Sequence, residues 1–188
     1  MRRVASWRVL GLTASMAACG GGTPDAQNPD RPLPVYDSHS AELFDDAIEP
    51  TALGYPSDTS QPRPIGDTRL RERTQIGDAV VRAKVTTVTS KAEDSGRSWQ
   101  VGLRTTEHLA GSGALPKDFS LSVDPTDPAA GVLKGFEARL IGSRFVAFVR
   151  EFRRPGAPGD SDLHFHLAAD SPEEIQAVKA ALASDQVH

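Results

Sequence analysis

The stretch RFVAFVREF, residues 144–152, decides the fold because it carries apolar side chains on both faces of a strand. Side chains alternate between the two faces of a β-strand, so a half-buried strand is apolar only at every second position. Every position from 145 to 149 is apolar. We therefore expect this strand to be the most buried one, with its outer face covered by a helix near Ser40 or by the last helix of the chain.

Five further runs alternate between apolar and polar residues and predict strands around this one. Polar residues 92–97, which include a glycine, predict a hairpin with a longer loop between the first two runs. Gly142-Ser143 predicts a tight hairpin turn just before residue 144. The five runs lie at residues 78–88, 99–105, 119–123, 136–140 and 163–167.

Helical patterns flank the strands. Residues 67–75 fit one or two helical turns, with Leu70 as the main apolar contact and the charged residues on a solvated face. The sequence SPEE at 171–174 matches a capping box with proline at the first helical position. The apolar stripe that follows it predicts a C-terminal helix at about 171–184.

These patterns predict a mainly β, or α+β, domain over residues 65–188. Short alternating strands joined by turns favour a small antiparallel sheet, and closure of such a sheet removes its edges. We expect a partly closed, OB-like barrel of about six strands with a C-terminal helix. Fold alone does not establish function, since small barrels serve many unrelated ones.

Three stretches of the domain resemble netrin-like modules and other OB-type barrels. They are the first strand at 78–88, the strand exit EHLAG at 107–111, and RFVAF at 144–148 ahead of a C-terminal helix. Within this family, the tissue inhibitors of metalloproteinases act through an N-terminal cysteine tied by disulfides. This chain has a single cysteine, Cys19, so the resemblance does not extend to that mechanism.

The N-terminus has the layout of a cleavable secretion signal, with Arg2 and Arg3 followed by an apolar run from Val9 to Ala18. This run is too short for a permanent membrane span, which takes about 20 apolar residues. Its end, MAACG at 16–20, resembles the lipobox of bacterial lipoprotein precursors. The resemblance implies that residues 1–18 are removed and that Cys19 carries lipid.

Three other interpretations of this N-terminus stay open. It could be an ordinary signal peptide cut before a chance cysteine, an uncleaved anchor, or the start of a cytosolic protein. Stable anchoring takes more than one acyl chain, and lipoproteins of this type normally carry several. Gly20 replaces the aspartate that often retains such lipoproteins at the inner membrane, which favours the outer membrane.

Charge and composition limit the partners. Removal of residues 1–18 takes away three arginines and no acid, leaving 18 basic against 25 acidic residues. A nucleic-acid partner is not expected, because phosphate binding relies on clustered positive charge. With Cys19 committed to lipid, no cysteine remains for a disulfide, so the domain depends on its own core.

Residues 19–64 have the composition of an acidic, proline-rich tether. Eight of the fourteen prolines lie between Pro24 and Pro64, together with eight acids and only two arginines. Such a segment is expected to be extended or disordered and to act as a spacer. One apolar pattern predicts a short helix at about 40–49, which is too short to be stable alone. We expect it to dock, either onto the domain or onto a partner, with the domain the more favoured.

His164 and His166 are the sharpest candidates for chemistry. Alternation places both imidazoles on one face of a strand, where they could offer two metal ligands, with Glu107-His108 or an acidic loop completing the site. The competing interpretation is an exposed polar face opposite buried Leu163, Phe165 and Leu167. No phosphate-binding, zinc-protease or calcium-loop motif is found in the sequence, and no cofactor is expected.

Together these features favour a non-enzymatic lipoprotein of the cell envelope. Its expected partners are the membrane, through the N-terminal lipid, and another envelope component that it binds or helps to assemble. One alternative is a metal-dependent or otherwise cryptic hydrolase using His108, His164 and His166. Another is a protease inhibitor that acts through a loop rather than through a cysteine.

Overall fold

The structure is a computed structural model that describes residues 32–55, 64–94, 96–113, 115–154, 156 and 160–185. Cys19 and the predicted signal peptide at 1–18 lie outside these residues. None of the described helices is both long and apolar enough to cross a membrane. The described elements are α1 (Ser38–Leu43), β1 (Ala47–Ile48), η1 (Pro50–Leu53), η2 (Pro64–Gly66), α2 (Thr68–Ile76), β2 (Ala79–Glu93), β3 (Gly96–Ala110), β4 (Asp118–Val123), α3 (Pro128–Leu140), β5 (Arg144–Arg153), β6 (Ser161–Ala169) and α4 (Pro172–Asp185).

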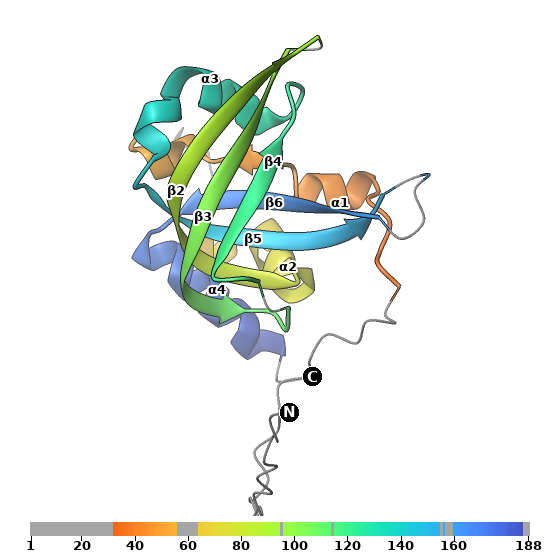
Figure 1. The fold of residues 1–188 in the computed structure, drawn as a ribbon. Helices are drawn as coiled ribbons and strands as arrows, with labels where there is room; N and C mark the ends of the chain where they lie inside the picture. The colour runs from red at the N-terminus through yellow and green to blue at the C-terminus, as the bar shows by residue number, and fades with distance from the viewer. Residues whose placement is uncertain are drawn as a thin grey trace, which may run out of the picture.

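One sheet organises the molecule, with the strand order β1-β6-β5-β2-β3-β4 (Figure 1). All neighbouring strands run antiparallel except β1, which pairs in parallel with β6. The edge strands β1 and β4 do not pair with each other, so the sheet is not closed. The chain therefore combines α and β structure around one six-stranded, largely antiparallel sheet.

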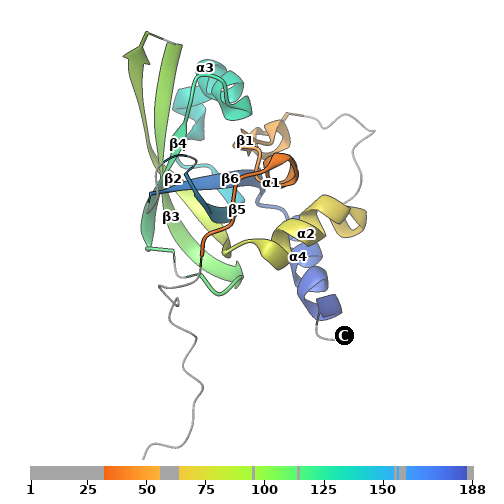
Figure 2. The same ribbon diagram turned by 90° about the vertical axis from the view of Figure 1, so that its right-hand side faces the viewer.

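Strand β5 is buried on both faces, as its sequence predicts. Five consecutive residues, 145–149, are fully buried. Phe145, Ala147 and Val149 pack into a core on one side, and Val146 and Phe148 pack into a second core on the other. Figure 2 shows α3 above β5 and β6 and the pair α2 and α4 below them.

The two cores are covered by different parts of the chain. The larger core contains residues of α3, among them Ala129 and Leu133, packed against β2, β3 and β4. The smaller core contains Leu43 and Phe44 from the N-terminal region and Val178 from α4. The expectation that a helix near Ser40 or the last helix would cover the outer face of β5 is confirmed, because both do so.

Five of the six predicted strands are confirmed, as β2, β3, β4, β5 and β6. The hairpin between the first two is also confirmed, but its predicted long loop at 92–97 is wrong. Strand β2 continues to Glu93 and β3 begins at Gly96, so most of the predicted loop belongs to the two strands.

The strand predicted at 136–140 is wrong, because these residues form the end of α3. Phe136 and Leu140 are four positions apart, a spacing that fits an alternating strand and also one turn of a helix, and Ala138 between them is exposed. Pro128 at the first helical position starts the helix. Gly142, with a φ of 91°, lies in the turn from α3 into β5 rather than in a hairpin.

Residues 32–55 differ from the tether and the short helix that their composition predicts. The helix α1 ends at Leu43 instead of continuing to residue 49, and Ala47–Ile48 add a strand to the sheet. Asp46 has a φ of 51°, which no helical residue adopts and which turns the chain toward β6. Burial of Leu43 and Phe44 supplies the apolar contacts that hold this region to the domain.

The two predicted flanking helices are confirmed, with one correction. Ser171 Oγ accepts a hydrogen bond from the Glu174 backbone N–H at 3.1 Å, as in a capping box. Leu70 is the buried apolar contact of α2. The charged residues of α2 do not all lie on a solvated face, however, because Arg73 is only 6% exposed.

Candidate functional site

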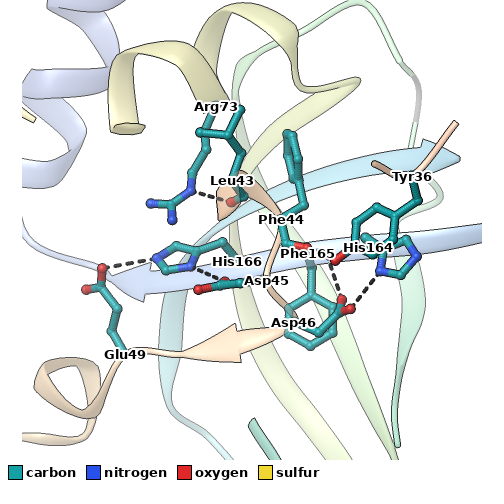
Figure 3. A network of polar contacts seen from close by, with 10 residues as sticks. All are labelled: Tyr36, Leu43, Phe44, Asp45, Asp46, Glu49, Arg73, His164, Phe165 and His166. Carbon is teal, nitrogen blue, oxygen red and sulfur yellow. Dashed lines mark hydrogen bonds and ion pairs between the residues drawn. The ribbon is translucent and has the colours of Figure 1, made fainter. Parts of the chain in front are cut away.

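The candidate site is a cluster of histidines and carboxylates between β6 and the chain from Asp45 to Glu49 (Figure 3). Phe165 and Leu167 of β6 belong to the larger core, so the residues that alternate with them, His164 and His166, face the other side of the sheet. His164 and His166 therefore share one face, as predicted. The interpretation of that face as exposed is wrong, because His166 is only 5% exposed.

The backbone after α1 places the carboxylates over this face. Asp46 N–H donates to Phe165 O, and Glu49 N–H donates to Leu167 O, both at 2.9 Å. Between them Ala47 and Ile48 pair with His166 and Leu167. This short parallel ladder holds the acidic residues in register with the two histidines.

His164 is oriented by Asp46. Its Nδ1 lies 2.6 Å from Asp46 Oδ2, and the other oxygen of that carboxylate accepts the Phe165 backbone N–H at 3.1 Å. The ring of Tyr36 stacks on the imidazole with 3.6 Å between centroids, and Phe152 meets it edge-on. Burial raises the pKa of Asp46, and the neighbouring His164 opposes that shift without cancelling it.

His166 is held by two carboxylates at once. Its Nδ1 lies 2.8 Å from Asp45 Oδ1, and its Nε2 lies 3.1 Å from Glu49 Oε1. Burial acts to lower the pKa of His166, but the bonds to Asp45 and Glu49 outweigh burial and raise it above 6.5. Burial acts to raise the pKa of each partner acid, but the bond to His166 and its charge outweigh it and lower both.

Two further charged groups approach His166 from the helices. The buried Arg73 of α2 donates a hydrogen bond from Nε to Leu43 O, the last residue of α1. Glu174, near the start of α4, is 8% exposed. Burial, and next the negative charge of Glu49, raise the pKa of Glu174 to about 7. A carboxyl with this pKa carries a proton in part of the population at neutral pH.

The geometry bears on the predicted metal pair. Both ring nitrogens of His166 already contact carboxylates, so neither nitrogen is directed at a position where it could share a metal ion with His164. Among the residues described, no three or more His, Cys, Asp or Glu side chains are grouped so that they could hold a metal ion. The pair His164 and His166 as metal ligands remains a prediction that this arrangement does not favour.

His108, the third histidine of the hydrolase alternative, is not brought to the other two. It lies on β3, and β2 and β5 separate that strand from β6 in the sheet. Three strand spacings correspond to about 14 Å. The neighbouring Glu107 pairs instead with Arg82, at 2.8 Å.

The sequence matches no family model and no curated protein.

Sequence reasoning found the two histidines but missed their partners. Composition assigns Asp45, Asp46 and Glu49 to an acidic tether, and the charge pattern of residues 67–75 places Arg73 on a solvated face. One signal was present in the sequence, namely two adjacent aspartates directly after the apolar pair Leu43-Phe44. A docked apolar pair brings its neighbours to the domain surface, where adjacent acids need basic partners.

Proposed function

We propose that this protein is a lipid-anchored lipoprotein of the bacterial cell envelope. The observation that carries the proposal is Cys19, the only cysteine, placed directly after small residues at the end of a short apolar run. In this proposal residues 1–18 are removed and Cys19 receives several acyl chains, because one chain gives only marginal membrane binding. Gly20 supports residence in the outer membrane.

We propose further that the domain has a binding or assembly role and no catalytic one. In support, Asp45, Asp46 and Glu49 are engaged by the histidines, and His166, which is bonded at both nitrogens, cannot exchange a proton with a substrate. Two surface hollows, one along the outer ends of β2, β3 and β4 and one between α4 and β3, include none of His108, His164 and His166 in their lining. The alternatives of a metal-dependent hydrolase or a loop-acting protease inhibitor have less support.

We also propose that the domain is a partly closed, OB-like barrel. Strand β4 approaches β6 although the sheet order places the two strands apart. Such curling supports a barrel open on one side, the form in which OB-type domains bind their ligands.

The anchoring is tested by Cys19→Ala in the full chain, expressed in a bacterial host. Wild type is expected in the membrane fraction with a mass that shows cleavage before residue 19 and added acyl chains. The variant is expected either as uncleaved precursor or as soluble protein. Thr23→Ala, just beyond the motif, serves as the matched control and is expected to behave as wild type. A Cys19→Ala protein that is cleaved normally and stays in the membrane would refute the lipid anchor.

The binding role is tested by cross-linking in intact cells, purification through the lipoprotein and mass spectrometry. The comparison is between the full chain and a version that ends at Pro64. One abundant partner that requires the domain is expected. If both versions recover the same proteins, the domain has no binding role under these conditions and the proposal fails.

A further inference from the structure

The chain from Val35 to Glu49, which we name the latch segment, is attached to the sheet through few backbone bonds. At one end Val35 forms an isolated bridge to Arg153, and Arg153 N–H donates to Pro34 O at 2.9 Å. At the other end the two-residue strand β1 pairs with β6. Two residues of parallel ladder give little stability alone. The side chains of the segment must therefore supply most of its attachment.

One side-chain attachment of the latch segment depends on the protonation state of His166. A neutral imidazole has one N–H donor and one acceptor nitrogen, whereas an imidazolium donates from both. His166 places both nitrogens within hydrogen-bond distance of carboxylate oxygens, those of Asp45 and Glu49. An ionised carboxylate only accepts hydrogen bonds. The observed geometry therefore requires the imidazolium form or a proton on one of the acids.

With the ring protonated, His166 and Arg73 together match the negative charges of Asp45 and Glu49, the two acids that His166 contacts. Arg73 provides the other positive charge in the cluster, and loss of the His166 proton would leave the acids of the latch segment in excess. A neutral ring would also turn a lone pair toward one carboxylate, which is repulsive. The charged groups that act on His166 come from the latch segment, α2 and α4; they are Asp45, Glu49, Arg73 and Glu174. Asp46 and Asp67 act on these partners in turn, and His164 acts on Asp46.

We propose that residues 35–49 form a pH-sensitive latch, closed by the His166 imidazolium between Asp45 and Glu49 and opened when His166 loses its proton. Opening moves Leu43 and Phe44 away from β5. These two residues cover Val146, Phe148 and Phe152 in the smaller core. An open latch thus exposes an apolar surface and the free edge of β6, the kind of edge that accepts an added strand.

The pH window follows from the direction of each shift. The pKa of His166 is raised in the closed state, so its contribution is complete below 6.5 and is lost as pH rises through the raised value. The pKa values of Asp45 and Glu49 are lowered, so their contributions are complete above about 4.5 and are lost only as pH falls toward the lowered values. The latch is therefore tightest between these limits and opens on the alkaline side.

Hydrogen exchange of the full-length chain in detergent, read by mass spectrometry between pH 5.5 and 9, tests the latch. Rates are corrected for the exchange of an unstructured peptide. Linkage predicts that the opening constant for residues 44–49 rises about tenfold per pH unit from 6.5 up to the raised pKa of His166. Amides of the β2–β3 hairpin provide the internal reference and should keep a constant protection. Uniform protection of residues 44–49 across this range would overturn the proposal.

Glu49→Gln identifies the group responsible. A glutamine can donate its amide N–H to Nε2 of a neutral His166 while Nδ1–H donates to Asp45, so the closed geometry no longer needs the imidazolium. At pH 8.5 the variant is expected to protect residues 44–49 about tenfold or more above wild type. Glu42→Gln removes the same charge from an exposed acid of α1 and is expected to open as wild type does.

Glu174 titrates close to the same range and needs its own control. With Glu174→Gln the alkaline opening is expected to persist, because the bonds between His166 and the latch segment are unchanged. If Glu174→Gln abolishes the opening while Glu49→Gln leaves it intact, the switch is not His166 and the proposal fails. As an independent readout, the ring ¹⁵N signals of His166 should show both nitrogens protonated at pH 6.

Discussion

The two faces of the sheet are stabilised by different chemistry. On the face covered by α3, residues such as Phe145 and Val149 pack against apolar side chains in one continuous core. On the other face a smaller apolar core borders the buried cluster of His166, Asp45 and Glu49. Apolar burial does not depend on pH, whereas paired ionisable groups stabilise the fold only over a limited pH range. We therefore expect the two faces to respond differently to the same change of pH.

The two faces also differ in how far apart in the sequence their contacting residues lie. The α3 face is built mainly from elements that follow one another in the chain, β2 to β5, with Ile48 of β1 and Phe165 and Leu167 of β6 completing it. The other face joins Asp45 to His166, which are 121 residues apart. Long-range pairs of this kind close large loops, and the chain pays that entropy before the contact forms. The covering of this face is therefore the part of the fold expected to detach first.

The largest effect is expected from truncating the phenylalanines of β5, which lie on opposite faces. Phe145→Ala and Phe148→Ala each remove a fully buried ring and should each lower the free energy of unfolding by about 3 to 5 kcal/mol. Phe148 lies 6.3 Å from the ring of His166, so its loss should also change the dependence of stability on pH. Urea unfolding of both variants at pH 6 and pH 9 measures this. The same pH dependence in both variants would contradict the distinction between the faces.

His166→Ala is expected to lower the free energy of unfolding by less than the phenylalanine substitutions do. Removing one partner leaves Asp45 and Glu49 without their donor, which should cost about 3 kcal/mol at pH 6. The cost should shrink at pH 9, because the raised pKa of His166 means that wild type loses this contribution as pH rises. His39 also bonds a carboxylate, that of Glu72, but on an exposed surface. His39→Ala should therefore show no measurable change at either pH, and an equal loss in both variants would contradict the role of burial.

Much of the α3 face could be predicted from sequence because periodicity is a local signal. Alternation at 78–88, 99–105 and 119–123 identified β2, β3 and β4, and the apolar run at 144–152 identified β5 with its two buried faces. The same signal failed at Phe136 and Leu140, whose spacing fits a helix as well as a strand. Composition failed for residues 32–55, where prolines and acids indicated a spacer.

The histidine cluster could be predicted only in part, for a physical reason. Alternation places His164 and His166 on one face of β6 whatever covers that face. The identity of the covering residues depends on the turn at Asp46, whose positive φ follows from no local pattern. Apart from the adjacent aspartates after Leu43-Phe44, no local signal marks Asp45, and nothing in the sequence distinguishes Glu49 from the acids around it.

Glu174→Gln tests the pH dependence of stability on the face that holds the histidine cluster. Burial raises the pKa of Glu174 to about 7, so the folded state binds a proton that the unfolded state has released above its ordinary value of 4.5. Stability due to this group therefore falls as pH rises from about 4.5 to 7. The variant should be about 1 to 3 kcal/mol more stable than wild type at pH 8, with little difference at pH 4.5. Glu173→Gln, at the adjacent exposed position, is the matched control. Thermal unfolding across this pH range would contradict the prediction if both variants behaved alike.

The smallest change in the free energy of unfolding is expected from Tyr36→Phe, at the rim of the cluster, where the ring of Tyr36 stacks on His164. Its hydroxyl donates to Phe44 O at 2.7 Å, which ties the start of the latch segment to its apolar centre. Tyr36→Phe keeps the stacked ring and removes only this bond, so it should cost about 0.5 to 1.5 kcal/mol. Tyr55 offers the control, since its hydroxyl meets an exposed Arg139 at 3.4 Å and Tyr55→Phe should change stability by less than about 0.5 kcal/mol.

Because the bond of Tyr36 lies within the latch segment, its loss should also raise exchange at residues 44–49 at pH 6 without altering the β2–β3 hairpin. A Tyr36→Phe protein as stable and as protected as the Tyr55→Phe protein would mean that the segment is held by Asp45, Glu49 and its apolar residues alone.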